Sequence, residues 1–295
     1  MVIVPGPVSK SLALKIAEIL GDDVLHLILR DFSDGEWVLQ FEVENFERKG
    51  AGEEFIIVQT TYPYQDRNLL QLLVMIDTLY DLFGVNPTVV VPYLAFSRQD
   101  KSFLPGESIT AKTILNLIYD RGAKRLITVD VHNEDIFSYV AIDCVNVTAM
   151  KEIGKYLLKI GLKNPIVISP DEGAITHAKA VAEILGCEHD FFKKKRSRVT
   201  GEINVEKGDI QVKGRDVVVV DDIISTGGTV LEAVKIVKSL GALKVYAACT
   251  HGLLVKDAFE RIINAGAEKI FGTDTVQSEI SVISVAPVIA ETLKK

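Results

Sequence analysis

Short runs of consecutive apolar residues alternate along this chain with longer segments in which apolar residues recur every three to four positions. Runs of the first kind are typical of strands, and the second pattern is typical of helices that pack on one face. Strands are predicted at Val2–Val4, Leu25–Leu29, Trp37–Val43, Phe55–Gln59, Thr88–Val91, Leu126–Val131, Ile166–Ser169, Val217–Val220 and Val245–Cys249. Helices are predicted at Leu12–Leu20, Asn68–Phe83, Lys112–Tyr119, Met150–Ile160, Ile175–Leu185 and Val230–Leu240. The alternation indicates an α/β protein with mostly parallel sheets flanked by helices.

The second half of the predicted element order repeats the first half, which indicates two domains built on one duplicated fold. The segments that match are Phe55–Gln59 with Pro165–Ser169, Val89–Val91 with Val217–Val220, and 121–132 with 240–251. In this alignment the loop Tyr93–Ser108 of the first half takes the place of the loop after Val220 in the second half. The expected domains are 1–145 and 146–283, with a C-terminal helix at about 284–295 that packs back on the first domain.

Composition and charge narrow the class of protein. The chain has 295 residues, more than one typical domain, and 48% of them are hydrophobic, which is ample for two cores. A formal net charge of −7 argues against a general nucleic-acid or membrane-binding surface. Three scattered cysteines, Cys144, Cys187 and Cys249, favour neither a disulfide framework nor a zinc site. The start shows no signal-peptide pattern and no apolar stretch is long enough to span a membrane, so a cytoplasmic protein is expected.

The segment from Val217 to Thr229 carries the strongest indication of chemistry. Four valines predict a buried strand, Asp221 and Asp222 follow where such a strand surfaces, and a loop of small residues then precedes a helix. The loop residues are Ser225, Thr226, Gly227, Gly228 and Thr229. Backbone N–H groups at the start of a helix lack internal partners, so this arrangement is suited to phosphate. Because the loop lacks the lysine of a P-loop and follows two carboxylates, it favours a sugar phosphate over a polyphosphate. An ordinary strand–helix turn is the weaker alternative.

Further segments hold charged or titratable residues, and each also has a purely structural interpretation. The loop Arg98-Gln99-Asp100-Lys101 follows a buried strand and is either a phosphate-binding loop or a solvated one, with nothing in the spacing to decide. His132 comes directly after another strand, at the edge where ligands bind in such sheets. Asp171 is either a ligand for a hard cation or a helix N-cap. Lys194 and Arg196 lie in the strongest basic run of the chain, for which a solvated loop is the alternative.

The segment Asp221–Thr229 resembles the ribose-5-phosphate signature of the type I phosphoribosyltransferase fold, which includes phosphoribosyltransferases and ribose-phosphate pyrophosphokinases. The run Arg98-Gln99-Asp100-Lys101 is similar to one that is typical of the pyrophosphokinases and absent from the transferases. Further segments that resemble motifs of the pyrophosphokinases are Phe32–Glu36, Asp130–His132, Ser169–Ala174 and Lys194–Arg196. From its residues alone, Phe32–Glu36 would be an ordinary polar turn. The compact chain resembles the archaeal members of the family most closely.

The resemblance implies two tandem phosphoribosyltransferase-type domains and a reaction of nucleotide biosynthesis, in which ATP and ribose 5-phosphate give AMP and 5-phosphoribosyl 1-diphosphate. The residues implied for ATP are Phe32, Asp34, Glu36, Arg98, Gln99, Asp100 and His132. Those implied for ribose 5-phosphate are Asp221, Asp222, Ser225, Thr226, Gly227, Gly228 and Thr229. Lys194 and Arg196 are implied as catalytic residues, and His132 and Asp171 as ligands of Mg²⁺.

The resemblance also bears on partners and on alternative functions. In the family the adenine-binding loop comes from a neighbouring subunit, which implies a homo-oligomer, at least a dimer, with shared active sites. One alternative is a phosphoribosyltransferase, which uses 5-phosphoribosyl 1-diphosphate and needs neither the Arg98–Lys101 run nor a duplicated first half. The other is a non-catalytic regulatory subunit of the pyrophosphokinase. Such subunits tend to have damaged ATP and catalytic loops, and none is evident in this sequence.

Overall fold

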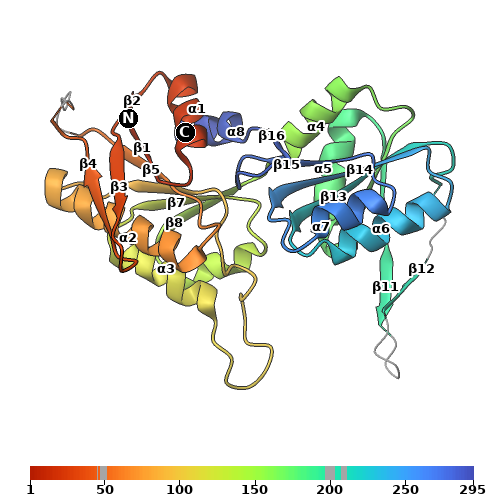
Figure 1. Ribbon diagram of the computed structural model, residues 1–295, viewed down its shortest axis with the longest axis horizontal. Helices are drawn as coiled ribbons and strands as arrows, with labels where there is room; N and C mark the ends of the chain where they lie inside the picture. Colours follow the sequence, from red (N-terminus) through yellow and green to blue (C-terminus); the bar gives the residue numbers. More distant parts are fainter. Residues whose placement is uncertain (45, 47–51, 197–202, 207–210) are drawn as a thin grey trace. The chain divides into compact units, whose positions relative to one another are not determined.

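The computed structural model describes residues 1–44, 46, 52–196, 203–206 and 211–295, and for 193–196 and 203–206 it describes the backbone alone. The chain forms two compact units (Figure 1). Unit 1 comprises Met1–Thr148 together with Val285–Lys295, and unit 2 comprises Ala149–Ser284. Both ends of the chain therefore belong to unit 1.

Unit 1 is built on a sheet of six parallel strands. In spatial order they are β2 (Asp23–Val24), β1 (Val2–Pro5), β5 (Phe55–Val58), β6 (Thr88–Val91), β7 (Arg125–Val129) and β8 (Asp143–Val147). The helices are α1 (Lys10–Leu20), α2 (Gln65–Phe83), α3 (Thr110–Asp120) and α8 (Ala286–Leu293). The apolar sides of α2 and α3 pack in one core with alternate residues of the strands, and α1 and α8 lie together on the other face (Figure 1). Because helices cover both faces, β1, β5 and β6 are buried at every position.

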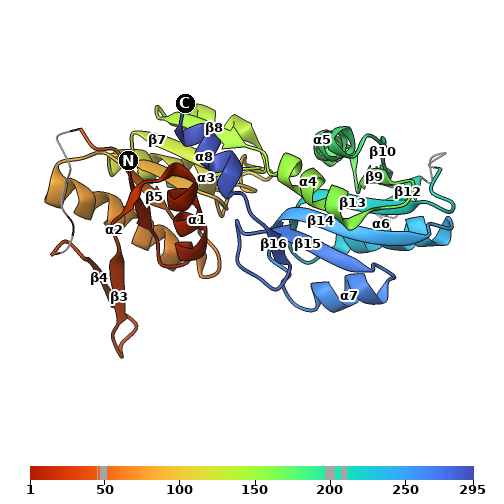
Figure 2. The same cartoon turned by 90° about the horizontal axis from the view of Figure 1, so that it is seen from above.

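Unit 2 repeats this plan. Its six parallel strands, in spatial order, are β10 (Glu188–Phe191), β9 (Ile166–Ser169), β13 (Asp216–Ile224), β14 (Lys244–Gly252), β15 (Lys269–Thr273) and β16 (Ser281–Ile283). The helices are α4 (Met150–Ile160), α5 (Ile175–Leu185), α6 (Gly228–Ser239) and α7 (Ala258–Asn264). Residues of α6 and α7 form one core with the sheet, and residues of α4 and α5 form a second core on its other face (Figure 2).

Two antiparallel hairpins stand apart from the two sheets. β3 (Leu27–Asp31) pairs with β4 (Trp37–Phe41), and β11 (Lys193–Arg196) pairs with β12 (Ile203–Glu206). The predicted strand Leu25–Leu29 is therefore wrong in its bounds, because β2 ends before Leu25 and β3 belongs to a different sheet. The turn Phe32–Glu36 connects β3 to β4, as the sequence predicted.

The duplication is real, but the predicted alignment of its two copies is shifted by one strand. When the strands of each six-stranded sheet are numbered along the chain, without the hairpin strands, both sheets have the spatial order 2-1-3-4-5-6. Strand β5 therefore corresponds to β13, β6 to β14 and β7 to β15. The counterpart of the loop after β13 is therefore the loop Thr60–Tyr64 and not Tyr93–Ser108. His132 follows β7, whereas His251 lies within β14, so these histidines are not equivalent. Short valine- and isoleucine-rich runs resemble one another, and only the pairing of strands fixes the correct alignment.

The bounds of several elements differ from those predicted from the local sequence, and some elements were not predicted. β13 does not end at Val220 but continues through both aspartates to Ile224, because β14 also continues and pairs with it. The pairs Asp221–Cys249 and Ile223–His251 belong to this extension. The C-terminal helix predicted at about 284–295 is α8 (Ala286–Leu293), and the unpredicted strand β16 precedes it. The 3₁₀ helix η1 (Glu134–Tyr139), β8, α7 and β15 carry patterns too short or too polar to have been predicted.

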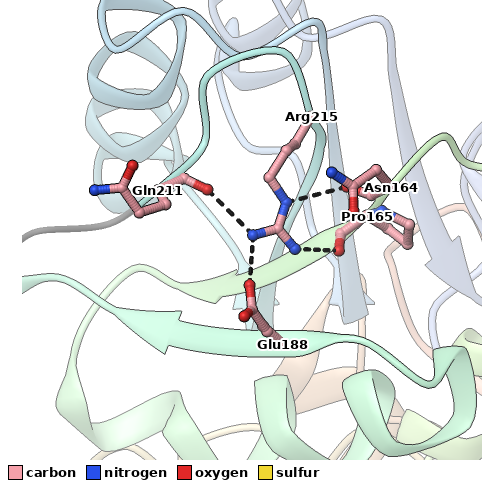
Figure 3. A network of polar contacts seen from close by, with 5 residues as sticks. All are labelled: Asn164, Pro165, Glu188, Gln211 and Arg215. Atoms are coloured by element: carbon pink, nitrogen blue, oxygen red, sulfur yellow. Dashed lines mark hydrogen bonds and ion pairs between the residues drawn. The ribbon is translucent and has the colours of Figure 1, made fainter.

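Arg215 ties together three segments at the amino ends of β9 and β10 (Figure 3). Its Nε donates to the carbonyl oxygen of Asn164 at 3.1 Å, Nη2 to that of Pro165 at 2.9 Å, and Nη1 to that of Gln211 at 3.2 Å. Nη1 also pairs with the carboxylate of Glu188. The Arg215 side chain is only 13% exposed, although Asn164 and Gln211 lie at the surface. Gln211 begins the segment that returns from the β11–β12 hairpin, and Arg215 therefore fixes the base of that hairpin.

We predict that Arg215→Met lowers the free energy of unfolding by on the order of 2 kcal/mol, because it removes three hydrogen bonds and an ion pair made by one largely buried side chain. A matched control is Arg261→Met. Arg261 is 41% exposed and pairs with Asp257 at 3.7 Å across one helical turn, so its loss should cost about 0.5 kcal/mol or less. Urea unfolding measures both variants. Equal losses in the two would contradict the special role of Arg215.

Candidate active site

The topological switch point of unit 2 lies between β9 and β13. After β9 the chain crosses to β10 on one side, and after β13 it crosses to β14 on the other, so the loops at the carboxyl ends of these adjacent strands diverge. Ligands of open α/β sheets bind in the crevice that such divergence leaves. Asp171 follows β9, and the segment Asp221–Thr229 ends β13 and begins α6. The structure therefore brings Asp171 and all the predicted sugar-phosphate residues to one crevice.

Carboxylates gather at this crevice. The backbone N–H of Asp222 donates to Oδ1 of Asp221 at 3.0 Å. Burial raises the pKa of Asp221 to about 8, with further contributions from the charges of Asp222 and Asp171. Asp171 precedes the short 3₁₀ helix η2 (Glu172–Ala174) but makes no capping hydrogen bond with its side chain, so the N-cap interpretation is not what the structure shows. Oxygen donors of this kind suit hard cations or sugar hydroxyls.

Backbone hydrogen bonds join the loop after Asp222 to the loop after β14. The carbonyl oxygen of Ile224 accepts hydrogen bonds from Leu253 N and Leu254 N at 3.0 Å each, and that of Ser225 accepts from Val255 N at 3.1 Å. Gly227 is the residue before α6 and has φ 71°. A Cβ there would lie 2.9 Å from Cδ1 of Ile262, so the loop packs closely on α7.

The outer side of this loop is open to solvent. Thr226, Gly228 and Thr229 are exposed at the start of α6, while Gly227 is buried. The N-cap residue is Gly227, which has no side chain that could cap the first amide groups of the helix. The positive end of a helix of 12 residues thus faces the crevice edge with exposed hydroxyl groups beside it, which suits a phosphate.

In unit 1 four of the predicted nucleotide residues, Arg98, Gln99, Asp100 and His132, follow β6 and β7, which are adjacent and parallel. Arg98 is exposed, whereas the side chain of Gln99 is engaged within its own loop, with Nε2 donating to the carbonyl oxygens of Ser108 at 3.2 Å and Lys101 at 3.4 Å. Asp100 is buried, and its Oδ2 accepts from Nδ2 of Asn133 at 2.7 Å. Arg98 and Lys101, the two ends of this run, are exposed, whereas Gln99 and Asp100 use their polar atoms within the protein.

His132 is exposed and lies three residues after Val129, the last residue of β7. It follows the buried Asp130, which has φ 39°, a strained value of the kind found at functional sites. The hydrogen bond from Asn133 lowers the pKa of Asp100, and the charges of Lys101 and His132 lower it further. His132 therefore lies near enough to the Arg98–Lys101 loop to influence its electrostatics, and the structure brings these residues together.

The turn Phe32–Glu36 is a separate part of unit 1. The ring of Phe32 is 53% exposed, and Asp34 accepts a hydrogen bond from Glu36 N at 3.1 Å, which rigidifies the turn. An ion pair between Asp31 and Arg67 attaches the hairpin to the start of α2. Phe32, Asp34 and Glu36 thus belong to a hairpin of their own and not to the β6–β7 edge.

Lys194 and Arg196 lie on β11, where they pair with Val205 and Ile203 of β12. Their side chains lie outside the part of the chain that the structure describes. The two ends of the β11–β12 segment enter the core of unit 2 through Phe192 and Val212, which are both 1% exposed. The hairpin is therefore anchored by apolar burial at each end, in addition to the bonds of Arg215.

Sequence reasoning missed Asn133 and Tyr139. Asn133 caps η1, because its Oδ1 accepts from Asp135 N at 3.0 Å, and the hydroxyl group of Tyr139 donates to the backbone oxygen of Asp100 at 3.0 Å. The run Asn133-Glu134-Asp135 is an N-cap signal with acidic residues in the first turn, and it could have been recognised as such.

Within the described residues, no group of three or more His, Cys, Asp or Glu side chains could hold a metal ion by itself. None of the described helices is long and apolar enough to cross a membrane.

Comparison with known proteins agrees with this geometry. Residues 1–122 match the N-terminal domain of ribose phosphate pyrophosphokinase, and residues 146–284 match the phosphoribosyl transferase domain. The ribose-phosphate pyrophosphokinase of Methanosarcina acetivorans is 39% identical over 298 residues, which cover 100% of both chains. That of Methanothermobacter thermautotrophicus is 37% identical over 287 residues, 97% of each chain.

A solved structure extends this agreement to the fold. The crystal structure of phosphoribosylpyrophosphate synthetase from Mycobacterium smegmatis matches 99% of this chain and 97% of its own, with a TM-score of 0.84 and 28% identity. The resemblance recognised in the sequence and the predicted fold class are thereby confirmed. The chain belongs to the ribose-phosphate pyrophosphokinase family.

Proposed function

We propose that this chain transfers the β,γ-diphosphoryl group of ATP to the C1 hydroxyl group of ribose 5-phosphate. The C1 oxygen attacks the β-phosphorus, the bond from that phosphorus to the oxygen bridging it to the α-phosphorus breaks, and AMP leaves as the hydroxyl group gives up its proton. The observation that carries the proposal is the crevice of unit 2, where carboxylates suited to hydroxyl groups adjoin a helix start suited to phosphate. A sugar phosphate is a ligand that carries both hydroxyl groups and a phosphate group.

On unit 2, the 5-phosphate binds at Ser225–Thr229, and Asp221 and Asp222 bind the hydroxyl groups of the ribose. The raised pKa of Asp221, caused first by burial and then by Asp222, supports a division of labour between them. A protonated Asp221 donates a hydrogen bond to one hydroxyl oxygen, while Asp222 accepts from another. The pair then fixes the orientation of the sugar, which is a large part of catalysis in phosphoryl transfer.

On unit 1, Arg98 and His132 bind the phosphates of ATP, and Gln99 and Asp100 complete the loop that carries Arg98. The exposed ring of Phe32 stacks on adenine, and Asp34 and Glu36 accept hydrogen bonds from the adenosine. Lys194 and Arg196 neutralise the charge that develops during transfer. The exposure of Arg98 and His132 at one sheet edge supports their part of this assignment.

Mg²⁺ fits this donor set. Asp171 follows β9 beside the end of β13, and after burial it is the carboxylates of Asp222 and Asp171 that raise the pKa of Asp221, so oxygen donors lie close together there. We assign Asp171 and His132 as its protein ligands, with the remaining positions taken by phosphate oxygens and water, which is the usual way in which proteins hold this ion. When bound, Mg²⁺ neutralises charge on the phosphates.

Two further assignments follow from the same family. A homo-oligomer in which a neighbouring subunit supplies Phe32–Glu36 accounts for an apolar ring left 53% exposed at Phe32. A cytoplasmic location accounts for the three cysteines, Cys144, Cys187 and Cys249, which are all free thiols.

The proposal predicts AMP release from ATP that requires ribose 5-phosphate. A phosphoribosyltransferase would release no AMP from these substrates, and a non-catalytic subunit would release none at all. The Lys194→Ala/Arg196→Ala double variant should reduce turnover by on the order of a hundredfold or more, with unchanged thermal stability. AMP release is followed by chromatography with and without the sugar phosphate. Wild-type turnover in the double variant would remove both residues from the mechanism.

The tight packing of the phosphate loop predicts different effects at two neighbouring glycines. Gly227→Ala should lower stability by about 1–2 kcal/mol and raise KM for ribose 5-phosphate, because alanine disfavours φ 71° and its Cβ would lie 2.9 Å from Ile262. Gly228→Ala should retain full thermal stability, since no atom lies within 4 Å of the added Cβ. Thermal unfolding distinguishes the two. Equal melting temperatures would mean that the loop is not constrained as described.

The pKa of Asp221 predicts a pH-dependent stability. Between an unfolded value near 3.8 and a folded value of about 8, the folded protein binds a proton that the unfolded chain releases, so stability is lost as pH rises through this window. Asp221→Asn removes the group, and it should be more stable than the wild type by roughly 2 kcal/mol or more at pH 8.5, with a smaller difference at pH 5. Urea unfolding at several pH values measures this difference. Parallel pH profiles would contradict the raised pKa.

A further inference from the structure

Asp100 lies in the middle of the loop that carries Arg98, yet its side chain faces the protein. It is 8% exposed, and its Oδ2 accepts from Nδ2 of Asn133 at 2.7 Å. The hydroxyl group of Tyr139 donates to its backbone oxygen at 3.0 Å. Both partners belong to the segment that follows β7, whereas Asp100 belongs to the segment that follows β6. Residue 100 is thus bonded twice to the neighbouring loop, once through its side chain and once through its backbone.

Both polar atoms of the Asn133 side-chain amide are hydrogen-bonded. While Nδ2 donates to Asp100, Oδ1 accepts from the backbone N–H of Asp135 at 3.0 Å. The orientation of the amide is unambiguous, because a carboxylate only accepts and a backbone N–H only donates. Asn133 directly follows His132, and Asp100 is two residues from Arg98. A single charge-assisted bond therefore joins the two short segments that carry the exposed cationic groups.

We propose that Asn133 and Asp100 form a positioning pair that sets the separation of Arg98 and His132, and that Asp100 acts through this bond instead of touching the nucleotide. The inference rests on the proposed function, since it concerns the binding of ATP phosphates. Tyr139 reinforces the pair from the backbone side. Loss of the bond releases the middle of the Arg98 loop and weakens ATP binding. Ribose 5-phosphate binding is unaffected, because its residues lie in unit 2.

Exchange of the two side chains tests the pair. In Asn133→Asp, the new carboxylate still accepts from Asp135 N but faces the carboxylate of Asp100, so KM for ATP should rise by on the order of tenfold or more. Asp100→Asn should be mild, since its amide oxygen still accepts from Asn133. In the Asp100→Asn/Asn133→Asp double variant the donor and acceptor are exchanged, and KM for ATP should return to within about threefold of the wild type. Tyr139→Phe should raise KM for ATP by a few-fold without a change of charge.

The controls separate this inference from simpler explanations. Asn86→Asp makes the same substitution at an exposed position before β6, at the opposite end of the sheet, and should leave both KM values unchanged. KM for ribose 5-phosphate and the melting temperature are measured for every variant, so that misfolding is recognised. If Asp100 binds the nucleotide directly, Asp100→Asn will be severe and the double variant will not recover, which would overturn the proposal. An inactive wild type would instead refute the proposed function.

Discussion

The organisation of both units depends on one constraint: in a parallel sheet, side chains for ligands come from the carboxyl ends of the strands, and the loops there leave a crevice where they diverge. Each unit has one such switch point, between β1 and β5 in unit 1 and between β9 and β13 in unit 2. In unit 2 this crevice is lined by Asp171, Asp221 and Asp222, and burial, followed by the charges of the other two carboxylates, raises the pKa of Asp221 to about 8. Strongly perturbed pKa values of this kind cluster at functional sites.

The equivalent crevice of unit 1 is occupied by the side chains of the protein. Gln59 is fully buried and accepts from Val8 N, and its Oε1 would lie 2.1 Å from a Cβ at Gly6. Thr60 N donates to Oγ of Ser9 at 2.7 Å, so this loop amide has a partner within the protein. A phosphate cannot replace these groups without leaving buried polar atoms unpaired. The candidate nucleotide residues of unit 1 accordingly lie one and two strands away, after β6 and β7.

The local pattern of apolar residues was sufficient to predict much of the fold. It failed where the pairing of strands determines the length or the position of an element. The helices that end in glycine were predictable, since Gly21, Gly84, Gly161 and Gly186 all take left-handed conformations. The length of β13 was not, because Asp221 and Asp222 end an apolar run and only their pairing with β14 keeps them in a strand. For the same reason the predicted alignment of the two copies was shifted by one strand, because the sequence of a valine-rich strand does not indicate its position in a sheet.

The motifs predicted their own positions well but did not distinguish ligands from supports. In the run after β6, Arg98 is exposed, whereas Gln99 and Asp100 use their polar atoms on Ser108 and Asn133. After β13, Thr226 and Thr229 are exposed, whereas Gly227 is buried against α7. An exposed loop residue can be held for catalysis only if its neighbours are fixed by packing or hydrogen bonds. A motif therefore contains residues that are exposed to a ligand and residues that hold the loop in place. Only the hydrogen bonds and the packing of the folded chain show which residue has which role.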